Sequence, residues 1–356
     1  MAFDPSRLET SGAPIPLLED VASETSARGA GGQFDASQDG TLVYLSGRVL
    51  NPVRPIQWLD ASGETMPLIT QPGTLSAPRL SPDGRHLAYS ATGSKGGDVW
   101  VYDLDRQTPT QVTFTAPGGR ELAWAPDSKH LVFGDGTSLW WIRADGSAQP
   151  QKILDTTGND NIESPRPYFF TSDGRLAYST LNRGLPDIYT LSVDLTDPEH
   201  PKPGQPQAFL NDPQVVEVDP AFSPDGKFLA YSSNESGTEE IYVRPFPGPG
   251  GKWKISTEGG KFPVFARATH QLFYLGGDDR IWVTDYTIRA DSFDAGKPRV
   301  WSPTKILRTG TRQNFDISAD GKHAVVFPAA EVSEQQGNLH ATFLFNFFDE
   351  VRRRMK

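Results

Sequence analysis

The chain has 356 residues, a formal net charge of −10 and no cysteine. The missing cysteine excludes a disulfide framework, cysteine-ligated zinc, iron–sulfur clusters and thiol catalysis, and the acidic balance argues against a protein that tracks nucleic-acid phosphates. With 34 glycines, 30 prolines and 11% aromatic residues, the composition is typical of short strands joined by tight turns. No apolar run reaches the roughly 18 residues of a membrane span. No secretory signal pattern is visible, and we expect no membrane insertion by this chain.

A hairpin pattern recurs along the chain with spacings of 44, 44, 46, 52, 44 and 51 residues. The clearest copy is FSPDGKFLAYSS, and a worn sixth copy, FARATHQLFYL, has Thr269 in the place expected for Asp. Pro pre-sets φ, Asp bonds to its own backbone and Gly takes the left-handed region, so each copy predicts a type I turn with a glycine bulge. The aspartates interpreted as structural turn formers are Asp39, Asp83, Asp127, Asp173, Asp225 and Asp320.

A third strand is predicted after each hairpin, as in the segments DVWVYDL, SLWWIRA, DIYTLSV, EIYVRPF and RIWVTDY. Polar edge strands follow, as in TPTQVTF, QPQKILD and GKWKIST. Four antiparallel strands in roughly 45 residues make one blade of a β-propeller. We therefore predict an all-β, single propeller in which Trp140 and Trp141 face opposite sides of one blade.

The number of blades depends on how the ring closes. Seven hairpins favour seven blades, with six or eight as alternatives because the sixth copy is degraded. The last hairpin is followed by a third strand at 339–348 and by no fourth, while residues 14–21 form an unpaired strand near the start. We expect this N-terminal strand to close the ring, since closure removes two exposed sheet edges. The predicted domains are a propeller at 1–348 and a basic tail at 349–356, with a single helix predicted from Phe347.

These hairpins resemble the TolB-like (PD-repeat, WD40-like) propeller repeat. The segment YSSNESGTEEIYVRPFPGPGGKWKISTEGG at 231–260 is more specific, because it resembles the C-terminal propeller of bacterial receptor-type serine/threonine protein kinases. The start AFDPSRLETSGAPIPLLEDV at 2–21 and the ending FNFFDEVRRRMK are similar to that family too, so the resemblance covers essentially the whole chain. It implies a sensor or interaction module on the far side of a membrane from a kinase.

The kinase itself is absent from this sequence. None of the glycine-rich loop, V-A-I-K, H-R-D and D-F-G motifs occurs. Two expectations on location stay open: extracytoplasmic or periplasmic if the chain is part of a larger kinase, and cytoplasmic if it is complete as given.

No catalytic constellation stands out from the residues. The nucleophile elbow G-x-S-x-G is absent, as are H-x-x-x-H and H-E-x-x-H. His86, His130 and His323 share one repeat position, on different blades, and are interpreted as surface residues beside turns. The adjacent pairs Asp278-Asp279 and Glu239-Glu240 are interpreted as solvated charges, because neighbouring strand residues point to opposite faces. We predict no enzyme activity, no metal and no cofactor.

A ligand is expected at the mouth of the central channel, where loops converge on a rigid scaffold. The loops that lead into the first strands and those between second and third strands share one face. Candidate ligand-binding residues on it are Lys95, Arg120, Asp160, Glu163, Arg166, Arg183, Glu217, Asn234, Glu235, Lys261 and Arg312. Their mixture of arginine and carboxylate suits a peptide or a polar small molecule.

Three functions compete. The favoured one is a non-catalytic binding or sensor module for a protein, peptide or small ligand, acting as a monomer. The alternatives are a TolB-like envelope protein-interaction scaffold, and a propeller enzyme acting on polysaccharides or glycosides through carboxylates at the channel mouth.

Overall fold

The computed structural model describes residues 2–4, 9–11, 18, 21, 23–26, 29–32, 34–46, 55–70, 74–93, 96–114, 121–158, 163–182, 184–289, 292–308, 313–329 and 340–354. Contacts divide the chain into two compact units. The ring unit comprises Val53–Ala329, and the terminal unit comprises Met1–Pro52 with Ala330–Lys356. This division differs from the predicted propeller of residues 1–348 with a separate tail at 349–356.

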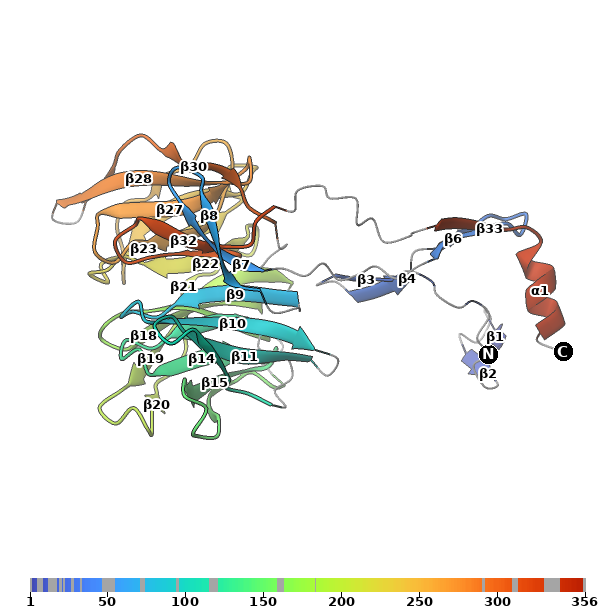
Figure 1. Cartoon of the computed structure of the whole chain (residues 1–356), viewed down its shortest axis with the longest axis horizontal. Helices are drawn as coiled ribbons and strands as arrows, with labels where there is room; N and C mark the ends of the chain where they lie inside the picture. The colour runs from blue at the N-terminus through green and yellow to red at the C-terminus, as the bar shows by residue number, and fades with distance from the viewer. Residues whose placement is uncertain are drawn as a thin grey trace. The chain divides into compact units, whose positions relative to one another are not determined.

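The described part of the ring unit contains six antiparallel sheets with four main strands each, called blades one to six (Figure 1). Blade one is β9 (Thr74–Leu80), β10 (His86–Gly93), β11 (Gly96–Asp103) and β12 (Thr108–Gln111). Blade two is β13 (Leu122–Trp124), β14 (His130–Gly134), β15 (Ser138–Arg143) and β16 (Gln151–Asp155). Blade three is β17 (Glu163–Phe170), β18 (Arg175–Asn182), β19 (Leu185–Asp194) and β21 (Gln207–Leu210), with β20 (Lys202–Pro203) also paired to β19.

The remaining blades repeat this order. Blade four is β22 (Glu217–Phe222), β23 (Phe228–Ser233), β24 (Glu240–Pro245) and β25 (Trp253–Lys254). Blade five is β26 (Gly260–Phe265), β27 (Gln271–Gly276), β28 (Arg280–Arg289) and β30 (Arg299–Lys305), with β29 (Ser292–Ala295) paired to β28. Blade six is β31 (Phe315–Ile317), β32 (His323–Val326), β7 (Ile56–Asp60) and β8 (Thr65–Ile69). The all-β prediction and the predicted third strands are confirmed.

The six blades close into a ring. The first strand of each blade, here called its inner strand, contacts the next one, in the order β9, β13, β17, β22, β26, β31 and back to β9. Each pair of neighbouring blades encloses its own apolar cluster, including the pair formed by blades six and one. An open row of six sheets would bury one interface fewer. The described residues of the ring unit therefore form six blades, and the favoured count of seven for the whole chain is not confirmed.

Strands from the start of the ring unit complete the last blade. β7 pairs antiparallel with β32, from His323 opposite Asp60 to Val326 opposite Gln57, and Figure 1 shows the blue β7 beside the red β32. Ring closure by an N-terminal strand was predicted, but for residues 14–21, most of which lie outside the described residues. The sequence pattern of a strand does not show which other strand it pairs with. Pairing between strands more than 250 residues apart in the sequence is determined by packing.

The terminal unit holds the first hairpin of the repeat. β5 (Phe34–Ala36) and β6 (Leu42–Ser46) form a three-stranded sheet with β33 (His340–Leu344), and the helix α1 (Phe347–Arg354) follows where a helix was predicted. Two further strand pairs are β1 (Ala2–Asp4) with β2 (Glu9–Ser11), and β3 (Ser23–Ser26) with β4 (Gly29–Gly32). The Asp39 hairpin is thus a fragment of a blade outside the ring unit. Within the described residues, no helix has the length and apolar character to cross a membrane.

The repeat turns owe their shape to Asp and Gly. In blade four, the Ser223 hydroxyl donates to the Asp225 carboxylate at 2.6 Å, and the Lys227 N–H donates to the same oxygen at 3.1 Å. Gly226 has a φ of +70°. Equivalent Ser or Thr to Asp bonds exist at Asp39, Asp83, Asp173 and Asp320. In blade two, Asp127 instead accepts from the His130 ring at 2.6 Å.

Two turn glycines differ in what surrounds them. Gly84 and Gly174 both have positive φ, but an added Cβ has nothing within 4 Å at Gly84 and meets the Val193 carbonyl oxygen at 2.5 Å at Gly174. We expect Gly84→Ala to cost about 1 kcal/mol through backbone strain alone, and Gly174→Ala about 2–4 kcal/mol because the clash is added. Urea unfolding of both variants checks this, and equal losses would contradict it.

Candidate functional site

The direction of the inner strands defines two faces of the ring unit. Each inner strand begins at the face that carries the loops between second and third strands, here called the loop face. It ends at the repeat turns, here called the turn face. Four inner strands contain a residue of positive φ, namely Ala77, Ser164, Asp219 and Phe262, and all four blades show a register shift between the first two strands. Such bulges re-aim side chains.

Ionisable side chains fill the centre of the ring. Arg79, Glu121 and Asp219 are each 5% exposed or less, although they belong to three different blades. Among the described residues, Arg79 Nη2 and both Glu121 carboxylate oxygens have no hydrogen-bond partner. Asp219 accepts from the Ser232 hydroxyl at 3.1 Å. Buried charged groups are costly unless paired, so this arrangement is unlike ordinary core packing.

The surroundings shift the pKa values of these groups. Burial raises the pKa of Asp219 to about 7, with nearby Glu239 adding to the effect. Burial also raises the pKa of Tyr168 and of Asp316, against the lowering effect of Arg79 on Asp316. The pKa values of Arg79 and Arg267 are lowered by burial, which the Asp316 carboxylate opposes. Perturbed groups that gather in one place mark a candidate site.

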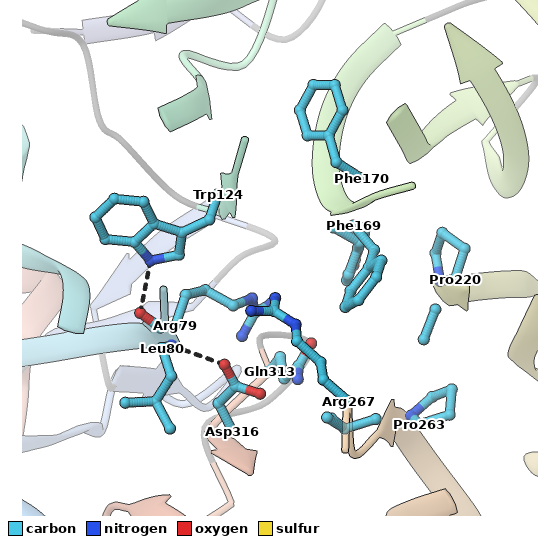
Figure 2. Close-up of a pocket in the computed structure, with 13 residues that line it drawn as sticks. Arg79, Leu80, Trp124, Phe169, Phe170, Pro220, Pro263, Arg267, Gln313 and Asp316 are labelled. Atoms are coloured by element: carbon cyan, nitrogen blue, oxygen red, sulfur yellow. Dashed lines mark hydrogen bonds between the residues drawn. The ribbon is translucent and has the colours of Figure 1, made fainter. Parts of the chain in front are cut away.

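Figure 2 shows the cavity on the ring axis, lined by residues from all six inner strands or the turns after them. Its volume is about 30 Å³. The Trp124 indole N–H donates to the Arg79 carbonyl at 2.8 Å, and the Leu80 N–H donates to Asp316 at 2.8 Å. A metabolite needs a pocket of roughly 300 Å³ or more, so this cavity cannot enclose one.

A larger pocket of about 340 Å³ opens on the loop face between blades four and five. Lys261 Nζ lies 2.5 Å from the Glu239 carboxylate in its wall. Arg308 pairs with Asp279 and donates to the Gly277 carbonyl at 2.6 Å. At Gly277 an added Cβ would lie 2.3 Å from the Glu258 carbonyl oxygen, so the floor is backbone packed on backbone.

The predicted loop-face residues are only partly brought together. Lys261 lines the 340 Å³ pocket, and Glu235 forms an ion pair with Lys252 at 2.5 Å. Asn234 accepts from the Val216 N–H at 2.8 Å, beside Glu217, whose carboxylate accepts from the Asp212 N–H at 3.3 Å. These bonds give Asn234 and Glu217 a role in holding the loops of blade four.

Glu163 and Arg166 belong to blade three. Glu163 is exposed and Arg166 is half-buried. Burial is the largest single effect on the pKa of Arg166 and lowers it, but Glu121, Tyr168 and Asp219 together raise the pKa above its ordinary value. These partners place Arg166 with the central charges. The predicted residues Lys95, Arg120, Asp160, Arg183 and Arg312 lie outside the described residues.

Several site residues were not predicted. Arg79, Asp219 and Asp316 lie within inner strands that read as apolar or turn-flanking segments, so no local pattern marks them. Arg267 did carry a signal, because it stands in the worn repeat where other ring copies have a small or neutral residue.

Two interpretations of charged residues need correction. His130 is buried, stacked on Trp141 with ring centroids 5.0 Å apart, and bonded to Asp127, so it is not a surface residue. Glu240 is 1% exposed and accepts from the Ser256 hydroxyl at 2.5 Å, because the third strand of a blade is covered by the neighbouring blades on both faces. In the part of the chain that the structure describes, no three His, Asp or Glu side chains are grouped to hold a metal ion.

Stability should fall as the pH rises from about 4 to 7. Burial raises the pKa of Glu217 and of Asp219 to about 7, above the values of 4.5 and 3.8 that apply to the unfolded chain. The folded state therefore binds more protons in this window, and each group lowers the free energy of unfolding by on the order of 1 kcal/mol per pH unit. Turn aspartates with lowered pKa values act in the opposite direction, mainly below pH 4.

Urea unfolding at pH 5 and pH 7.5 measures this slope. The double variant Glu217→Gln/Asp219→Asn should flatten it, while exposed Asp105→Asn should leave it unchanged. A wild-type stability that rises between these two pH values would contradict the account.

Comparison with known proteins supports the fold. No protein-family model matches the sequence. An uncharacterized protein from Agrobacterium fabrum is 24% identical over 248 residues, which is 68% of this chain and 78% of that protein. The Tol-Pal system protein TolB of Francisella tularensis is 25% identical over 176 residues, 46% of this chain and 37% of TolB. The match therefore spans little more than a third of that relative.

Solved structures give the same result. A TolB candidate from Agrobacterium tumefaciens superposes with a TM-score of 0.55 and 16% identity, covering 78% of this chain and all of that one. A chain of the nidogen/laminin complex gives a TM-score of 0.51 and 15% identity, with 73% and 94% coverage. These likenesses show that the chain has a TolB-like β-propeller fold.

Proposed function

We propose that the chain is a non-catalytic propeller that binds another protein through its loop face, as an interaction scaffold. The observation that carries this proposal is the contrast between the two cavities. The axial cavity has about 30 Å³, whereas the loop face has a shallow pocket of about 340 Å³. A propeller with a filled centre has its surface available for recognition rather than an enclosed chamber.

The charges around the pocket favour a protein partner. Lys261 with Glu239 and Arg308 with Asp279 place charges of both signs beside the glycine residues that line the pocket. A polar rim of mixed charge around a less polar centre is typical of protein interfaces. The likeness to TolB supports the hypothesis of an interaction scaffold over that of an enzyme. It is also compatible with an extracytoplasmic location.

A small-ligand sensor is the second candidate. The segment 231–260, whose resemblance to the receptor-kinase propellers is the most specific, supplies Glu239, Gly259 and Gly260 to the loop-face pocket. A pocket of about 340 Å³ is within the range that holds small ligands. Association with a kinase stays a prediction from that resemblance.

The test is quantitative capture from a cell-envelope fraction by three immobilised proteins. They are the wild type, the loop-face variant Lys261→Glu/Arg308→Glu, and the control Arg106→Glu/Lys129→Glu, which changes charge equally at a pocket of about 380 Å³ near the repeat turns. We expect a protein that the wild type and the control capture and the loop-face variant loses. Capture lost only by the control, or robust turnover of glycans or peptides by the purified wild type, would overturn the proposal.

A further inference from the structure

Arg267 breaks the symmetry of the repeat at a defined position. In the ring, Phe222 pairs with Leu229 and Phe265 with Leu272, so Arg267 occupies the place of Pro224. The equivalent residues in the other blades are neutral, namely Pro82, Pro126, Ser172 and Ala319. One blade of six thus places a cation at the turn-face end of the channel.

Arg267 lies at the boundary between two cavities. It lines the axial cavity of about 30 Å³ and a neighbouring cavity of about 60 Å³, whose other lining residues include Gly84 and Ser318 in the turns. Its guanidinium lies over the Phe169 ring, 5.5 Å from the centroid. Figure 2 shows the guanidinium groups of Arg267 and Arg79 pointing toward one another beside Asp316.

Within the described part of the chain, the guanidinium nitrogens of Arg79 are not all hydrogen-bonded at this end, and two carboxylates, Asp316 and Asp83, act on Arg267. Arg79 is 5% exposed, its Nη1 donates to the Pro78 carbonyl at 3.0 Å, and its Nη2 has no partner among the described residues. Asp316 is the carboxylate with the strongest effect on both arginines, but its two oxygens accept from the N–H groups of Leu80 and Ile317. Glu121 and Asp219 act on Arg79 from the loop-face half of the channel.

We propose that Arg79 and Arg267 together bind a carboxylate group at the turn-face end of the channel. A cavity of about 30 Å³ holds a group of two or three heavy atoms, and a carboxylate can accept two parallel N–H bonds from a guanidinium. The carboxylate belongs either to a free small acid or to the C-terminus of a peptide. This site lies at the opposite end from the loop-face pocket, so it is independent of the proposed scaffold function.

The first experiment is a thermal titration of the full chain with acetate, against acetamide at matched ionic strength. We expect a saturable rise of about 2–4 °C in melting temperature with acetate and none with acetamide. Arg267→Gln should weaken the acetate response by about tenfold or more. Arg175→Gln is the matched control, because Arg175 also lies over a phenylalanine, 5.3 Å from the Phe246 centroid, and lines neither cavity.

A second measurement keeps the proposal falsifiable if Arg267→Gln folds poorly. A crystal structure of the wild type grown in acetate should show the carboxylate between the two guanidinium groups, and water there would overturn the site. The tripeptide Gly-Gly-Ala and its amide distinguish the sources. Tighter binding of the free tripeptide than of acetate identifies a peptide terminus, and weaker binding identifies a free acid. Equal responses to acetate and acetamide, or an unchanged response in Arg267→Gln, would contradict the proposal.

Discussion

Removing residues 1–70 will destroy the ring, whereas removing residues 1–52 together with 330–356 will leave it folded. The reason is that β7 and β8 form half of blade six. Ile56, Leu59 and Ile69 are at most 3% exposed and contribute to two interfaces between blades. Each buried side chain of this kind stabilises by about 1.5–3 kcal/mol, so their loss approaches the whole stability of a domain, about 5–15 kcal/mol.

The comparison uses the fragments 53–329 and 71–329. The shorter fragment also exposes the edge of β32, so we expect it to aggregate or to lose its cooperative thermal transition. The longer fragment should melt within a few degrees of the ring transition in the full chain. Similar melting curves for the two fragments would show that the ring is closed by other strands.

Trp141→Ala will destabilise the ring far more than Trp140→Ala. Trp141 is 1% exposed, packs between blades two and three, and donates from its indole to the Pro198 carbonyl at 3.0 Å. Truncation leaves a large cavity and removes the stacking on His130, which together cost about 3–5 kcal/mol. Trp140 packs on the other side, between blades one and two, and is only partly buried.

The Trp140 indole N–H donates to the Asp135 carboxylate at 2.7 Å, and Lys152 Nζ lies over the Trp140 ring, 5.2 Å from its centroid. Its truncation should cost about 1–2 kcal/mol. Guanidinium unfolding of both variants gives the two free energies. Equal values would mean that the two faces of the sheet are buried alike.

Local patterns predicted the blades, and only packing determined how they join. The alternation around Trp140 and Trp141 placed the rings on opposite faces, as observed, because a strand has a period of two. The Asp39 hairpin has the same turn chemistry as the others, yet it pairs with β33 in the terminal unit. Nothing in FDASQDGTLVYLS distinguishes a blade of the ring unit from the three-stranded sheet of the terminal unit, so the favoured count of seven, which includes this hairpin, is not confirmed.

Local sequence patterns also predicted only some residues of the candidate site. Lys261 could be predicted because the loop into an inner strand must open on the loop face. Arg79 and Asp219 could not, since their side chains reach the channel through bulges that shift the register of the inner strands. Arg267 could have been identified from the sixth copy of the repeat. A repeat turn without the Pro-Asp-Gly signature is subject to a different structural constraint, and Arg267 is the charged residue in that turn.

Hydrogen exchange of the full chain with and without a captured partner tests the central claim most directly. The account predicts added protection in the loop-face segments 234–239, 258–261 and 276–279, with the repeat turns at 81–86, 223–228 and 318–323 unchanged. Protection confined to the turns would place the partner on the opposite face and contradict the account.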